Sequence, residues 1–98
     1  MPWPKDGVDV LKEHNIHRGS LYKNDDCRCI LGWLEHWFGT DTEEFNIVRK
    51  IACEIIGHSM FTEWNDNFYR PKGEIARKIN KITATAGYVV DNPQAKNI

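Results

Sequence analysis

Three stretches with helical spacing of apolar residues, each followed by a glycine, constrain the fold of this chain more than any other feature. Apolar residues three and four positions apart form one face of an amphipathic helix, and glycine is favoured just past the last turn. In chain order, the stretches are residues 30–38, 42–56 and 71–86, and the glycines are Gly39, Gly57 and Gly87. The sequence therefore predicts three amphipathic helices that bury their apolar faces against one another.

The residues around these stretches predict where the helices begin. Thr40 and Asp41 each precede a glutamate by three residues, which is the capping-box pattern of a helix start. Pro71 suits the first turn of the last helix, because its missing N–H would have no partner there. A single helical turn capped by Ser59 is expected before that helix, and a short strand or extended tail is expected at residues 88–90.

The N-terminal third of the chain predicts a short helix and a β-hairpin. Asp6 is placed to cap a helix that ends near His14. Loose alternation at residues 17–23 favours a strand, and the NDD turn signal at 24–26 favours a return into a second short strand at Cys27. These expectations define a small α+β fold, mostly helical, with a short N-terminal β-hairpin packed on three or four helices.

Length and charge limit the classes of protein to which the chain can belong. Its 98 residues, 41% of them hydrophobic, suffice for one core, so we expect a single domain over 1–98 with frayed ends at 1–5 and 91–98. The formal net charge of −1 gives no global attraction to a polyanion or an anionic membrane. No apolar run approaches the roughly 20 residues that cross a bilayer, and the start MPWPKDG lacks a secretory signal pattern. We therefore expect a cytoplasmic protein with no membrane partner.

The C-x-C of Cys27 and Cys29 has three interpretations: a metal site, a redox pair, or the entrance to a buried helix. His36 or His58 would complete a tetrahedral zinc site, yet structural zinc usually shows two spaced cysteine pairs. The odd count of three cysteines argues against a disulfide framework. The pattern favours Cys29 as a small buried residue at the helix entrance. We expect free thiols and no cofactor, and a small thiol or metal protein is the third functional hypothesis.

Residues that could act as nucleophiles or general bases do not form a catalytic pattern along the chain. Four histidines are available as general bases, but none is joined by its spacing to a nucleophile. A cysteine and histidine dyad assembled in space stays open, because sites of that kind are defined by geometry. The sequence favours a non-enzymatic protein and leaves the question of an enzyme undecided.

Aromatic residues supply the leading candidates for a binding surface. Trp33 and Trp37 follow the helical stripe and are expected in the core, because a small domain needs the area that they bury. Asn65 and Asp66 are expected to cap backbone groups at a turn. The leading hypothesis is a protein-interaction module acting on a host macromolecule, since aromatic residues are enriched at interface hot spots. The candidate contact residues are Trp3, Phe61, Trp64, Phe68 and Tyr69.

Basic residues near the last helix give the alternative hypothesis, a small nucleic-acid-binding module. Residues 24–44 are mainly acidic, whereas residues 70–81 are mainly basic. Such polarity can steer a charged partner, but it is also typical of solvated helix surfaces with favourable helix dipoles. The nucleic-acid interpretation predicts a steep loss of affinity with salt. Its candidate contact residues are Arg70, Lys72, Arg77, Lys78 and Lys81.

The order of several short motifs resembles a family of small uncharacterised bacterial and phage proteins. The motifs are CILG at Cys29–Gly32, WND at Trp64–Asp66 and GEIARKIN at Gly73–Asn80. The resemblance covers roughly residues 8–88 and implies the fold, a bacterial or phage setting, and a glycine that permits close approach at the helix entrance. It departs from the family at Trp33, where a small residue is expected, and in the second predicted helix, which has no counterpart. The resemblance implies no activity.

Overall fold

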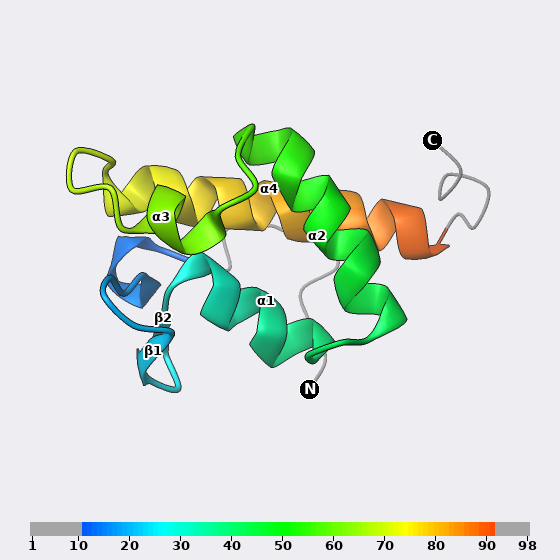
Figure 1. Ribbon diagram of the computed structural model, residues 1–98, viewed down its shortest axis with the longest axis horizontal. Helices are drawn as coiled ribbons and strands as arrows, with labels where there is room; N and C mark the ends of the chain where they lie inside the picture. The colour runs from blue at the N-terminus through cyan, green and yellow to red at the C-terminus, as the bar shows by residue number, and fades with distance from the viewer. Residues whose placement is uncertain (1–10, 92–98) are drawn as a thin grey trace.

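The computed structural model describes residues 11–91 of the chain, with side chains described up to Val89. In chain order, the elements are the 3₁₀ turn η1 (Glu13–Asn15), the strands β1 (Tyr22–Asn24) and β2 (Cys27–Arg28), and the helices α1 (Ile30–Phe38), α2 (Glu43–Ile56), α3 (Phe61–Asn65) and α4 (Lys72–Asp91). The two strands form an antiparallel hairpin. The predicted fold class is confirmed: a small α+β domain, mostly helical, with a short hairpin beside four helices (Figure 1).

The long helix α4 runs along the molecule, and the other elements are arranged around it (Figure 1). α2 packs along α4, α1 packs against α2 and α3, and η1 packs against α4. The hairpin lies beside the start of α1. This arrangement leaves the loop at residues 66–71, between α3 and α4, at one end of the molecule, on the left in Figure 1.

Side chains from all four helices form a shared core. Trp33 and Trp37 lie with ring centroids 5.0 Å apart and are 5% and 8% exposed, which confirms their predicted place in the core. The buried amide of Asn80 bonds to both the N–H and the carbonyl of Leu11, at 3.2 Å each, and so ties the chain before η1 to α4. The buried apolar residues of this core are Leu11, Ile16, Ile30, Trp33, Leu34, Trp37, Phe38, Val48, Ala52, Phe61, Trp64, Ile75, Ala76, Ile79, Ile82 and Ala86.

The start of α2 lies later than the capping-box pattern predicts. Its N-cap is Thr42, whose hydroxyl oxygen accepts a hydrogen bond from the Phe45 N–H at 2.9 Å. The same hydroxyl donates to the Phe38 carbonyl at 2.6 Å, so one side chain links the end of α1 to the start of α2. Gly39 and Asp41 both have positive φ, at 82° and 61°, and this tight turn moves the cap past the two predicted residues.

The end of α4 also differs from the prediction. The helix continues through Gly87 to Asp91, so the short strand or tail expected at residues 88–90 is wrong. Ile82 and Ala86 are fully buried and extend the apolar stripe into the last turns, and Gly87 is buried beside them. Burial of this stripe outweighs the roughly 1 kcal/mol that a glycine costs in a helix interior.

The hairpin is shorter than predicted. Only Tyr22–Asn24 forms the first strand, and residues 17–21 are irregular. Two backbone hydrogen bonds tie them to the second strand and the residue after it: the His17 N–H donates to the Arg28 carbonyl, and the Cys29 N–H donates to the Leu21 carbonyl, both at 3.0 Å. α3 confirms the short helical turn, but its N-cap is Met60 without a side-chain hydrogen bond, so the predicted Ser59 cap is wrong. His14 lies in η1.

Several expectations fall wholly or partly outside the described residues. The helix capped by Asp6, the contact residue Trp3 and the frayed ends at 1–5 and 92–98 lie there, whereas Asp91 is the last residue of α4. Within residues 11–91, no helix has both the length and the apolar composition to cross a membrane.

Candidate binding surface

The loop between α3 and α4 is anchored by Asn65, the last residue of α3. Its side chain is fully buried, its amide oxygen accepts from the Ile30 N–H at 2.8 Å, and its amide nitrogen donates to the His17 carbonyl at 2.8 Å. Asn65 thus joins three separate segments: α3, the first turn of α1, and the chain before the hairpin. The predicted role of this asparagine as a cap for backbone groups is confirmed.

Asp66 continues the anchor on the solvent side. Its carboxylate accepts from the Gly19 N–H at 3.2 Å and from the Asn65 amide nitrogen at 3.1 Å. Gly19 has a φ of 94°, a conformation that a residue with a side chain adopts with strain. Asp66 therefore caps a turn, as predicted, and no side-chain polar atom buried within the described residues lacks a hydrogen-bond partner.

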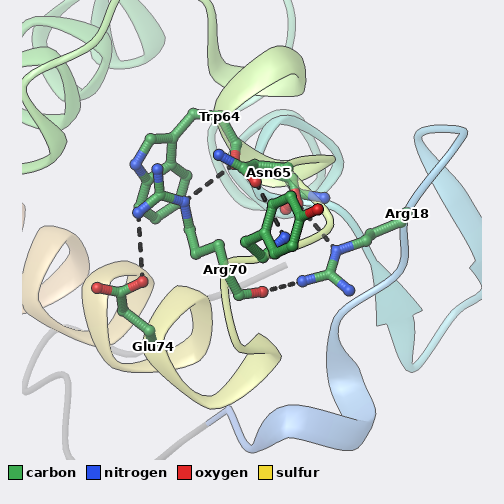
Figure 2. A network of polar contacts seen from close by, with 7 residues as sticks. Arg18, Trp64, Asn65, Arg70 and Glu74 are labelled. Carbon is green, nitrogen blue, oxygen red and sulfur yellow. Dashed lines mark hydrogen bonds and ion pairs between the residues drawn. The ribbon is translucent and has the colours of Figure 1, made fainter.

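Two arginines close the loop, as Figure 2 shows. Arg18 donates to the Asn65 carbonyl at 3.2 Å and to the Arg70 carbonyl, so it bridges both ends of the loop. Arg70 donates to the Trp64 carbonyl at 3.1 Å, pairs with Glu74 at 3.2 Å, and lies 4.3 Å from the centre of the Trp64 ring. The guanidinium of Arg70 therefore binds groups of the protein itself. We call Arg18, Asn65, Asp66 and Arg70 the loop base.

The aromatic tip, Phe68 and Tyr69, stands between these anchors. The two side chains are 83% and 92% exposed, and their rings contact each other edge to face with centroids 5.9 Å apart. Asn67 shapes the turn beneath them: its side-chain oxygen accepts from the Tyr69 N–H and its carbonyl accepts from the Arg70 N–H, both at 3.0 Å. A short, hydrogen-bonded loop therefore presents two adjacent rings to solvent.

The structure divides the predicted aromatic contact residues. Phe61 and Trp64 are each 5% exposed and belong to the core, so their rings are not accessible to a partner. Of the predicted contact residues within the described part of the chain, Phe68 and Tyr69 are the ones exposed to solvent, and Trp3 lies outside that part. Burial of Phe61 and Trp64 follows from the turn of α3, which directs both of them inward at a spacing of three residues.

The predicted basic residues also separate into two groups. Arg70 is turned into the loop base, and Lys78 is half-buried. Lys72, Arg77 and Lys81 are exposed on α4. The exposed basic residues of this segment therefore all lie on α4.

The cysteines and histidines of the hypothetical metal site do not gather at one place. Cys29 is 1% exposed and caps α1, its sulfur accepting from the Gly32 N–H at 3.3 Å; burial raises the pKa of its thiol. Cys27 is half-buried, and the His58 ring accepts from the Met60 N–H at 3.0 Å. His36 contacts Trp33, and burial followed by the charge of Arg28 lowers its pKa. Among residues 11–91, no group of three or more potential ligands could hold a metal ion.

The hairpin is held on α1 by contacts that sequence patterns do not reveal. A Cβ on Gly32 would overlap the Leu21 carbonyl oxygen, which itself accepts from the Cys29 N–H at 3.0 Å. The Arg28 guanidinium lies 5.5 Å from the Tyr22 ring centre and 5.7 Å from the Trp33 ring centre. The close approach predicted for Gly32 is therefore confirmed, whereas the roles of Arg18 and Arg28 have no local sequence signal.

Comparison with known protein families, curated proteins and solved structures finds no match to this chain. The loop base and the aromatic tip are therefore the structural features that bear on its function.

Proposed function

We propose that the chain is a non-enzymatic protein-interaction module of bacterial or phage origin that binds a host protein through the aromatic tip. The observation that carries this proposal is the 83% and 92% exposure of Phe68 and Tyr69 on a loop whose base is hydrogen-bonded on both sides. Solitary exposed apolar residues are ordinary, but two contacting rings on a fixed loop form a patch.

The energetics of such a patch favour a docking role. Burying two rings of this kind removes roughly 300 Å² from water, worth about 7 kcal/mol before the costs of association. Those costs are lower when the contact loop is already ordered, because little conformational entropy is then lost on binding. The hydrogen bonds of Arg18, Asp66 and Asn67 supply that order.

The proposed bacterial or phage origin is supported by the sequence resemblance alone. The motifs CILG, WND and GEIARKIN resemble those of small bacterial and phage proteins. Two residues of WND, Asn65 and Asp66, belong to the loop base, and the Trp64 ring lies 4.3 Å from the guanidinium of a third member, Arg70.

Site-specific photocrosslinking in bacterial cells that express the chain tests the proposal. The full chain carrying Tyr69→p-benzoylphenylalanine should give a discrete light-dependent protein adduct, because the probe replaces one ring of the aromatic tip. The same probe at Glu63, an exposed residue of α3, is the matched control and should give none. Phe68→Ser should abolish the adduct at position 69. Equal labelling from both positions, or no adduct from position 69, would show that the aromatic tip does not dock a protein.

A further inference from the structure

A cavity of about 320 Å³ opens to solvent between η1, the two residues before it, and the first half of α4. Its volume lies at the lower end of the range for small-molecule sites. The cavity shares no residue with the loop base or the aromatic tip. Lys12 also lines it, but this side chain already interacts with another group of the protein. The cavity is therefore a separate candidate site, large enough for a small ligand.

Hydrogen bonds hold the inner wall of the cavity in place. Leu11 and Ala76, 4% and 2% exposed, supply apolar surface to this wall. Asn80 also lines the cavity, and its amide bonds to both the N–H and the carbonyl of Leu11 at 3.2 Å each. The segment that carries Leu11 is thus fixed on α4 without a ligand. A wall that is already ordered lowers the entropic cost of binding.

Two opposite charges lie near one point of the cavity without pairing. A Cβ placed on Gly73 would lie 3.5 Å from Nη1 of Arg77 and 4.0 Å from Oε2 of Glu13. Within residues 11–91, neither of these two charged groups forms an ion pair or a side-chain hydrogen bond. Glu74, the acidic residue next to Gly73 on α4, is paired with Arg70 instead. The cavity therefore offers one cation and one anion to the same small ligand.

We propose that this cavity binds a free α-amino acid with an apolar side chain. Arg77 binds the carboxylate, Glu13 binds the ammonium group, and the apolar side chain lies against Leu11 and Ala76. Arginine is suited to carboxylates because its guanidinium presents several N–H donors in one plane. An α-amino acid carries both of its charges on one carbon, which matches two protein charges close to one point. This binding goes beyond the proposed protein docking.

NMR titration of the ¹⁵N-labelled full chain with L-leucine tests the inference. A ligand of this size is expected to bind with a Kd of about 1 mM and to shift the amide resonances of Gly73 and Ala76 until they saturate. Two analogues each lack one charge: 4-methylpentanoate has no ammonium group, and 3-methylbutylamine has no carboxylate. Each should bind roughly fivefold more weakly, because one ion pair is lost. L-Alanine, L-valine, L-methionine and L-phenylalanine then define which side chain fits best.

Single substitutions assign each charge of the ligand to its partner. Arg77→Gln and Glu13→Gln should each weaken L-leucine binding roughly fivefold. Arg77→Gln should leave the binding of 3-methylbutylamine unchanged, and Glu13→Gln should leave that of 4-methylpentanoate unchanged. Lys81→Gln on α4 and Glu63→Gln on α3 are the matched controls and should change the Kd of L-leucine less than twofold. All four are exposed positions, so the variants keep the fold.

Two further variants separate this inference from its competitors. Gly73→Leu places a side chain in the cavity and should abolish the shifts caused by L-leucine. Phe68→Ser/Tyr69→Ser should leave them unchanged, so the protein-docking proposal can fail while this one stands. The assignment would be overturned if none of the five amino acids caused saturable shifts at Gly73 and Ala76. Binding of 4-methylpentanoate or 3-methylbutylamine as tight as that of L-leucine, or equal losses in the cavity variants and their controls, would overturn it too.

Discussion

Asn65 of the loop base and Tyr69 of the aromatic tip lie four positions apart in the sequence and differ in burial, hydrogen bonding and chemistry. Asn65 in the loop base is 0% exposed and both ends of its amide are hydrogen-bonded, whereas Tyr69 in the aromatic tip is 92% exposed. A folded chain gains nothing for its own stability from a ring held in water. The difference separates residues that hold the fold from residues available to a partner, and it predicts opposite responses to substitution.

The largest effect is expected at Asn65. Asn65→Leu has similar volume but leaves the buried Ile30 N–H and His17 carbonyl without partners. Each orphaned group costs roughly 1–3 kcal/mol, so we expect the free energy of unfolding to fall by about 3 kcal/mol. Urea denaturation monitored by circular dichroism measures this free energy of unfolding. Asn46→Leu on the exposed surface of α2 is the control and should change stability by less than about 0.5 kcal/mol.

The second effect is expected at Gly32, which sets how closely the hairpin approaches α1. Gly32→Ala adds a methyl group that overlaps the Leu21 carbonyl oxygen, and overpacking of this kind costs about 2 kcal/mol. Gly73→Ala makes the same change in α4, where the new methyl group meets only Arg77 and Glu13 at ordinary contact distances. It should stabilise the chain by up to about 1 kcal/mol, because alanine is the better helix former. Effects of the same sign in both variants would refute the close approach.

A smaller loss of stability is expected when the hydrogen bonds from Arg18 to the two ends of the loop are removed. Arg18→Met keeps an unbranched side chain but removes the hydrogen bonds to the Asn65 and Arg70 carbonyls. We expect a loss of about 1–2 kcal/mol in the free energy of unfolding. Hydrogen-exchange mass spectrometry should show faster exchange in the peptide that contains residues 66–71. Unchanged exchange there would mean that Arg18 does not order the aromatic tip.

The hairpin, the helices and much of the core could be predicted from the sequence because their signals are local. The apolar period of residues 30–38, the glycines after α1 and α2, and the capping amide of Asn65 each act over a few residues. The extension of α4 past Gly87 could not be predicted, because burial of Ala86 against the core outweighs a local helix-stop signal.

The candidate surface was predictable only in part. Sequence composition identified an aromatic loop, but which rings face solvent depends on the packing of α3, which buries Phe61 and Trp64. Arg18 lies 47 positions from Asn65, and no local pattern indicates a contact over that separation. The exposed position of Tyr88 on α4 depends on the extension of this helix past Gly87, which its sequence signals do not predict.

The pH dependence of stability tests the environment of Cys29, which caps α1 beside the hairpin. Burial raises the pKa of this thiol above its ordinary value of 9.0, so the folded state holds the proton more tightly than the unfolded state. Its contribution to stability is full below about pH 9 and is lost as the pH rises through the folded pKa. Cys29→Ser keeps a capping group that does not ionise in this range. The difference in unfolding free energy between native chain and variant should therefore change above pH 9, to the disadvantage of the native chain. A constant difference up to pH 10.5 would contradict the assigned environment.

The most direct test of the separation between base and tip is the free energy of unfolding of Phe68→Ser/Tyr69→Ser, measured by urea denaturation beside the native chain. Because the two rings contact mainly each other and solvent, we predict a change of less than about 0.5 kcal/mol. A loss greater than about 1.5 kcal/mol would show that the aromatic tip supports the fold, and the assignment of these rings to a partner would then be wrong.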